Sequence, residues 1–153
     1  MPARPSSPAD SPLRYVRMAT AKLHAVTVTE ANLHYVGSIT IDEALLDAAG
    51  LAPYQMVQIT NQSNGAFWQT YAIPGRRGSG VICLNGTPAR HFQPGDKAYI
   101  IAEGFVEPAR VREHVLVVVF VDEKNRPTRI EQQSASGTRG RNVARPRGRR
   151  RAT

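Results

Sequence analysis

The stretch LHYVGSITIDEALLDAAG, residues 33–50, runs from a turn into the one convincing helix of the sequence. We expect the helix over residues 41–50, because Asp42 can cap its N-terminus and Gly50 suits the left-handed position just past its C-terminus. The sequence therefore predicts a short, well-delimited helix directly after the turn. Its expected apolar stripe consists of Ala44, Leu45 and Ala48.

Around this helix, residues 18–131 show short apolar segments separated by turns. Residues 22–29, KLHAVTVT, end in alternating valine and threonine, which is typical of a half-buried strand. The most apolar segment, residues 114–122, should be a central strand, and Asn64–Gly65 is a strong hairpin signal. Strands this short and evenly spaced favour a mainly β fold, a compact β-barrel.

The positive charge lies at the two ends of the chain. Of the net charge of +8, residues 132–153 contribute seven arginines and no acid, and residues 1–17 contribute +2, which leaves −1 for residues 18–131. The last segment has little apolar content to bury. We therefore predict a disordered N-terminal extension over 1–17, one domain over 18–131 and a disordered Arg-rich tail over 132–153.

Several classes of function are disfavoured by composition. The tail should attract polyanions weakly, but it lacks aromatic residues for base stacking, so no specific nucleic-acid partner is expected. No apolar run approaches the roughly 20 residues that cross a membrane, and the N-terminus lacks the apolar segment of a secretory signal, so a cytoplasmic protein is expected. No metal site is expected, because the histidines lack ligand spacing: His24, His34, His91 and His114.

Other local patterns are also uninformative. Residues 75–80, GRRGSG, lack the ending of a phosphate-binding loop and are expected to be a solvated hairpin loop. The single cysteine, Cys83, excludes an internal disulfide and is expected to be a small core residue, not a nucleophile. Ser38 lacks the GxSxG pattern of a hydrolase nucleophile. From these patterns alone, the chain is a small β domain.

The order of the segments carries more information. The segments KLH, NLHYVGS, TIDEALLDAAG, TYAI, RGSG, NG and PGD follow one another between residues 22 and 96. In this order and spacing they resemble the pyruvoyl-dependent aspartate 1-decarboxylases, and the resemblance covers about residues 18–127. It implies a small double-psi β-barrel with one or two short helices. It also implies a homotetramer with active sites between the subunits.

The resemblance gives the Gly37–Ser38 turn a chemical role. It implies that the chain cuts itself between these residues, after the Ser38 hydroxyl attacks the Gly37 carbonyl, and that Ser38 becomes a covalently bound pyruvoyl group. The pyruvoyl ketone would form a Schiff base with the amine of a small amino-acid substrate and accept electrons as carbon dioxide leaves. Whether a maturation factor assists the cleavage stays open.

The same resemblance assigns further residues of the site. Tyr71 would return a proton to the substrate carbon, while Thr70 and Asn85 would assist the cleavage at Gly37–Ser38. The residues implied in substrate binding are Lys22, His24, Tyr35, Phe67, Thr70, Gly86, Thr87 and Pro88.

Two positions depart from the family pattern. Phe67 stands where family members have an arginine that pairs with a substrate carboxylate, and Pro88 lacks the N–H that the family's usual alanine offers. Arg76 or Arg77 could supply the missing charge from a neighbouring loop.

Three hypotheses for function follow. The first is decarboxylation of L-aspartate to β-alanine, which feeds pantothenate biosynthesis. The second is decarboxylation of a different amino acid, one with a neutral or apolar side chain. The third, from another class, is an unprocessed module that binds polyanions through its Arg-rich tail.

Overall fold

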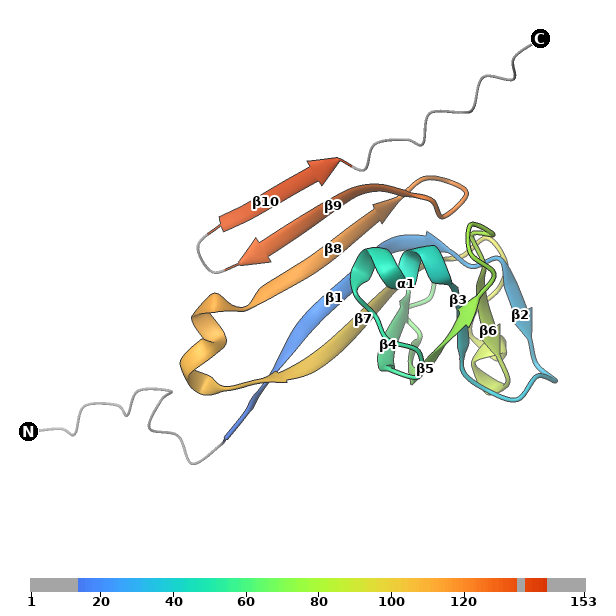
Figure 1. Ribbon diagram of the computed structural model, residues 1–153. Coiled ribbons are helices and arrows are strands. Elements are labelled where there is room, and N and C mark those ends of the chain that lie inside the picture. Colours follow the sequence, from blue (N-terminus) through green and yellow to red (C-terminus); the bar gives the residue numbers. More distant parts are fainter. Residues whose placement is uncertain (1–13, 135–136, 143–153) are drawn as a thin grey trace, which may run out of the picture.

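The structure is a computed structural model and describes residues 14–134 and 137–142 (Figure 1). Within these residues the strands are ordered β10-β9-β8-β1-β7-β4-β5-β3-β6-β2. The mainly β fold predicted from the sequence is confirmed, and its curved sheet is that of a small barrel. The elements are β1 (Val16–Thr27), β2 (Glu30–Asn32), β3 (Ile39–Asp42), α1 (Glu43–Ala49), β4 (Met56–Asn61), β5 (Phe67–Gly75), β6 (Ile82–Asn85), the 3-10 helix η2 (Thr87–Arg90), β7 (Lys97–Val106), the 3-10 helix η3 (Pro108–Glu113), β8 (Val115–Val121), β9 (Pro127–Ser134) and β10 (Gly137–Asn142).

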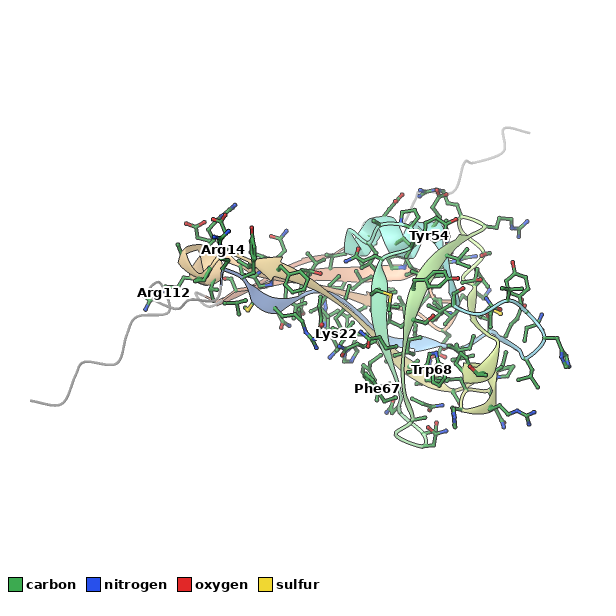
Figure 2. The ribbon with its side chains drawn as sticks, turned by 90° about the horizontal axis from the view of Figure 1, so that it is seen from below. Arg14, Lys22, Tyr54, Phe67, Trp68 and Arg112 are labelled. Atoms are coloured by element: carbon green, nitrogen blue, oxygen red, sulfur yellow. The ribbon has the colours of Figure 1, made fainter. Side chains whose placement is uncertain are left out.

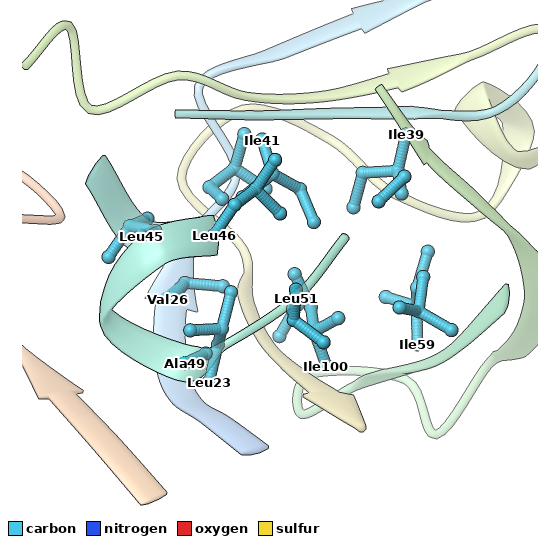
Figure 3. Close-up of a cluster of buried hydrophobic side chains, with 14 of the residues drawn as sticks. Leu23, Val26, Ile39, Ile41, Leu45, Leu46, Ala49, Leu51, Ile59 and Ile100 are labelled. Atoms are coloured by element: carbon cyan, nitrogen blue, oxygen red, sulfur yellow. The ribbon is translucent and has the colours of Figure 1, made fainter. Parts of the chain in front are cut away.

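One apolar core lies between the strands and α1, as Figure 3 shows. Leu23 of β1, Ile59 of β4 and Ile100 of β7 have no exposed surface. Ile39 of β3 and Leu45 of α1 meet them from the other side and are equally buried. Burial of such side chains is the main favourable term in folding, so this cluster fixes β3 against the rest of the barrel.

A bulge in β1 adapts this long strand to the core. The antiparallel register with β7 pairs Leu23 with Ile100 and Val26 with Ala98, so one extra residue lies on β1 between the two pairs. Ala25 in this bulge has a φ of 53°. Leu23 and Val26 are therefore both buried, although strict alternation would point them to opposite faces.

The helix begins and ends as the sequence predicts, but it buries a different face. The Asp42 carboxylate accepts from the Ala44 N–H at 2.8 Å, and Gly50 adopts φ 71° at the C-terminus. The predicted stripe of Ala44, Leu45 and Ala48 is wrong for the two alanines, which are only half-buried. A stripe that includes both leucines buries more apolar surface than one that includes Ala44 and Ala48, and this determines which face of the helix lies inside. The buried residues are Leu45, Leu46 and Ala49.

Asp42 also anchors the glycine-rich loop between β5 and β6. Its carboxylate accepts from the Gly78 N–H at 2.9 Å and from the Gly80 N–H at 2.7 Å, and the residue is only 3% exposed. Arg77 of the same loop pairs with Glu43 and Asp47 of α1. One carboxylate therefore joins the helix N-terminus to the loop that leads into β6.

The ordered β structure differs from the predicted domain boundaries. β1 begins at Val16, inside the predicted extension, while residues 1–13 lie outside the described part of the chain. β9 pairs with the apolar β8, which lies between β1 and β9 as an inner strand. β9 extends to Ser134 and β10 spans Gly137–Asn142, so β structure continues into the predicted tail as far as Asn142. Backbone pairing of β9 to β8 and of β10 to β9 explains this, because it does not require apolar side chains.

Replacing Asp42 with alanine should lower the free energy of unfolding by about 2–4 kcal/mol. The substitution removes the helix cap and leaves two loop N–H groups without their acceptor. Urea unfolding followed by circular dichroism measures this change. Glu43→Ala is the matched control and should stay near wild type, because Glu43 is exposed. Equal losses in the two variants would contradict this role of Asp42.

Candidate active site

The Gly37–Ser38 dipeptide has an unusual backbone conformation. Gly37 has φ 59° and Ser38 has φ 75°, so two successive residues lie in the left-handed region just before β3. Glycine tolerates this region, whereas a residue with a Cβ, such as serine, does so only at a cost in energy. The Ser38 side chain is 3% exposed, and its Oγ has no hydrogen-bond partner among the described residues. A strained backbone and a buried, unpaired hydroxyl therefore occur in one residue.

The β3–β6 pairing holds this conformation in place. The antiparallel register pairs Ile39 with Leu84, and continuing it by one residue puts Ser38 opposite Asn85. The Asn85 N–H donates to the Ser38 carbonyl at 3.0 Å. On the other side of the turn, the Gly37 N–H donates to the Tyr35 carbonyl at 2.8 Å. Ser38 is thus held at its carbonyl while its hydroxyl has no partner.

Gly86 packs directly on this turn. It has φ 75°, and a Cβ built at this position would lie 3.2 Å from both the Cα and the N of Gly37. Its N–H donates to the Asn32 carbonyl at 2.8 Å. Any larger residue at position 86 would therefore press on the Gly37 backbone.

Parallel pairing brings β5 to the same place. The β3–β5 register pairs Ile39 with Ala72, so Thr70 and Tyr71 directly precede this pair on β5, as Gly37 and Ser38 directly precede it before β3. Thr70 is 9% exposed, whereas Tyr71 is 37% exposed and its ring lies 6.1 Å from that of Tyr54. A buried hydroxyl and an accessible phenol therefore belong to the strand next to the Gly37–Ser38 bond.

The Asn85 side chain is held by two residues, Cys83 and Thr40, to which the sequence analysis assigned no role in the site. The Cys83 thiol donates to Asn85 Oδ1 at 3.0 Å, and Asn85 Nδ2 donates to Thr40 Oγ1 at 3.0 Å. Cys83 is buried, as expected of a core residue. The signal that could have found these residues is strand alternation, because Cys83 precedes Asn85 by two positions and Thr40 follows Ser38 by two.

Lys22 and His24 belong to β1, which is not a hydrogen-bonded neighbour of β3. The sheet order places β7, β4 and β5 between β1 and β3. The His24 ring instead packs against those of Tyr99 at 5.0 Å and Phe120 at 4.9 Å.

The other predicted binding residues lie on β5 and in the segments on either side of the Gly37–Ser38 turn and Gly86. Phe67 is 57% exposed at the start of β5, near the β4–β5 turn, and Figure 2 shows it with Lys22 and Trp68. Tyr35 is 54% exposed in the loop before Gly37, and Thr87 and Pro88 begin η2 directly after Gly86.

The charges near the site are mostly engaged elsewhere. Arg77, one of two arginines considered as a substitute for the missing arginine, is paired with Glu43 and Asp47 of α1. Burial, with the charges of Lys22 and then Arg129, lowers the pKa of His24 below 6.5, and the charge of Glu131 opposes this shift.

No cluster of three or more histidine, cysteine or acidic residues that could hold a metal occurs in the described part of the chain. No helix there is long and apolar enough to span a membrane.

Comparison with known proteins identifies relatives over most of the chain. A family model described as aspartate decarboxylase matches residues 14–128. The aspartate 1-decarboxylase of Heliobacterium modesticaldum is 55% identical over 109 residues, which are 71% of this chain and 83% of that protein. The aspartate 1-decarboxylase of Bacillus pumilus is 56% identical over 118 residues, 77% of this chain and 91% of the relative. The aspartate 1-decarboxylase of Carboxydothermus hydrogenoformans is 51% identical over 123 residues, which are 80% of this chain and 97% of that protein.

His24 should titrate below pH 6.5 and be neutral at pH 7. Its desolvated ring and the nearby Lys22 disfavour the imidazolium, so the folded chain should lose stability as the pH falls from 6.5 toward the lowered pKa. NMR titration of the ring protons, assigned with His24→Asn, measures the midpoint. Lys22→Gln should raise the pKa and Glu131→Gln should lower it further. A midpoint above 6.5 would contradict this account of the β1 surface.

Proposed function

Because the chain belongs to the aspartate decarboxylase family, we propose that it is a pyruvoyl-dependent carboxy-lyase that converts L-aspartate to β-alanine and carbon dioxide. The observation that carries the proposal is the conformation of Gly37–Ser38, with two positive φ angles and a buried, unpaired Ser38 hydroxyl. A strained residue whose nucleophile lacks a partner is what a self-cleaving bond requires.

The proposed cleavage balances without any outside oxidant or reductant. The Ser38 Oγ adds to the Gly37 carbonyl carbon, the C–N bond breaks, and an ester replaces the amide. Loss of the Ser38 α-proton and expulsion of the Gly37 carboxylate leave dehydroalanine at position 38. Its enamine takes up water and releases ammonia, which yields the pyruvoyl group. The products are two chains, residues 1–37 and 38–153.

The surroundings of the bond support this route. Thr70 is buried on β5, two residues before the partner of Ile39, and in this route its hydroxyl hydrogen-bonds to the oxygen of the Gly37 carbonyl as it becomes negatively charged. Asn85 fixes the Ser38 carbonyl through its backbone N–H. Gly86 allows the chain after β6 to pack closely on the Gly37 turn, because a side chain at position 86 would press on the Gly37 backbone. These residues restrain both sides of the bond and leave the nucleophile free.

In the mature enzyme, the pyruvoyl group would supply a ketone that binds the substrate amine and accepts the electrons released with carbon dioxide. Tyr71 then acts as the proton donor to the substrate carbon, because it directly precedes the partner of Ile39 on β5 and its phenol reaches solvent. Thr70 also contacts the substrate. Tyr35 and Thr87 border the same turn from the loops before and after it.

Lys22 and His24 enter the proposal through a second copy of the chain. Both residues belong to β1, which is not hydrogen-bonded to β3, and the His24 ring packs against Tyr99 and Phe120 on its own sheet face. We therefore place the active sites between subunits of a homotetramer, with Lys22 and His24 of one chain facing Ser38 of its neighbour.

A second candidate substrate is favoured by Phe67. The pairs Tyr99–Thr60 and Thr60–Phe67 put Phe67 on the same sheet face as Tyr99, whose ring contacts Lys22 and His24. This surface offers an exposed phenyl ring instead of a guanidinium, and Arg77 is already paired. An amino acid with a neutral or apolar side chain suits such a wall better than one with a second carboxylate.

The purified protein should consist of two fragments that meet between Gly37 and Ser38, and Ser38→Ala should remain whole. The substitution removes the only attacking oxygen of the proposed route. Intact-mass analysis over a prolonged incubation measures both results. Ser79→Ala, an exposed serine of the glycine-rich loop, is the control and should be cut like wild type. A wild-type chain that stays whole with and without cell extract would contradict the proposal and favour the polyanion-binding hypothesis.

Phe67→Arg should raise kcat/KM for aspartate and lower it for a neutral substrate. A bidentate pair to the substrate carboxylate is worth roughly 2–4 kcal/mol, which corresponds to about 30- to 1,000-fold in specificity. The assay compares aspartate with asparagine, glutamine, leucine and aromatic amino acids in both proteins. Gln62→Arg, at an exposed position of the nearby β4–β5 turn, is the control for added charge. If wild type already prefers aspartate strongly and Phe67→Arg changes nothing, Phe67 does not contact the substrate side chain.

A further inference from the structure

Four polar side chains form one group on the β3–β6 pair. Thr40 pairs directly with Cys83, and Ser38 lies opposite Asn85 one step along the same register. Thr40 and Cys83 are directly opposed and therefore share a face, and Asn85, two residues after Cys83 on β6, projects to the same face. The hydrogen bond from the Asn85 N–H to the Ser38 carbonyl ties Ser38 to this group.

The Asn85 carboxamide is nevertheless bound to other residues. Its Oδ1 accepts from the Cys83 thiol at 3.0 Å, and its Nδ2 donates to Thr40 Oγ1 at 3.0 Å. Both ends of the amide are engaged, and the residue is 3% exposed. The Ser38 Oγ, by contrast, has no partner among the described residues. The side-chain amide of the residue that binds the Ser38 carbonyl is thus held by Cys83 and Thr40.

The Cys83 thiol is suited to donate this hydrogen bond. Burial raises the pKa of Cys83, and the charge of Glu30 and a hydrogen bond to its carboxylate raise it further, so the sulfur keeps its proton at neutral pH. Glu30 and Asn85 are therefore both acceptors within reach of this thiol. A protonated, buried thiol is a weak donor and a poor nucleophile. The same observations argue against a covalent role for Cys83.

We propose that Cys83 and Thr40 are positioning residues for the cleavage at Gly37–Ser38, because they hold the Asn85 carboxamide away from the Ser38 hydroxyl. If the carboxamide lost either partner, it would rotate and hydrogen-bond to Ser38 Oγ. That bond would hold the nucleophile away from the Gly37 carbonyl. This inference rests on the proposed function, since it concerns the rate of the same cleavage.

The first test measures the rate of cleavage by intact mass, from freshly refolded precursor. Cys83→Ala should slow cleavage about tenfold, because it leaves a buried amide oxygen without its donor. Cys83→Ser should recover most of the rate, since the serine hydroxyl can donate to the same oxygen. At the other end of the amide, Thr40→Val should be slow and Thr40→Ser near wild type.

The control separates positioning from packing. Ile82→Val removes one methylene from a fully buried neighbour on the opposite face of β6 and should stay within about twofold of wild type. If Cys83→Ala matches wild type, or Cys83→Ser is as slow as Cys83→Ala, this inference fails while the proposed function stands. If the wild-type chain never cleaves, the proposed function fails and the inference fails with it.

A second measurement does not depend on refolding of the alanine variant. The chain has a single cysteine, so its infrared S–H stretching band reports on Cys83 alone. In the uncut Ser38→Ala protein this band should lie at the lower frequency of a hydrogen-bonded thiol, and Asn85→Leu should shift it upward. A band that is insensitive to Asn85→Leu would mean that the thiol does not bind Asn85, and would overturn the inference.

Discussion

The hydrogen bond from the Asn85 N–H to the Ser38 carbonyl is the contact on which the site depends. It fixes the start of β3 at a residue with φ 75°, where a serine would not remain without support from the surrounding structure. The Ile39 side chain, fully buried in the core, holds the next residue. With the Ser38 carbonyl and the Ile39 side chain both fixed, the strained backbone is confined to the Gly37–Ser38 turn. A reactive bond is thus placed in a rigid barrel.

The remainder of the framework keeps β6 in position for this bond. Asp42 joins the helix N-terminus to Gly78 and Gly80 of the loop that precedes β6. From the other side, Asn125 accepts from the Thr27 N–H and donates to the Thr27 and Gly80 carbonyls, all within 2.8 Å. Two buried polar side chains therefore restrain the same loop. Polar networks that are fully satisfied stiffen a small barrel in this way.

Local features of the sequence were predictable because they depend on neighbours along the chain. The Asp42 cap, the Gly50 terminus and the Asn64–Gly65 hairpin all follow local rules and are present. The family was recognised from several motifs in order. The parallel pairing of β3 with β5 and the contact of Thr40 with Asn85 could not be read in this way, because they join residues more than thirty positions apart. Cys83 is only two residues from Asn85, but its contact depends on both residues being in a strand. The sheet beyond residue 131 was missed because backbone pairing requires no apolar pattern.

The central claim is that the strained Ser38 is converted into a pyruvoyl group. The most direct measurement is tandem mass spectrometry of the fragment that begins at residue 38, with and without borohydride reduction. The account predicts a fragment that lacks a free amine and gains two hydrogen atoms when its ketone is reduced. A fragment that begins with an ordinary serine, carries a free amine and is unchanged by borohydride would contradict it.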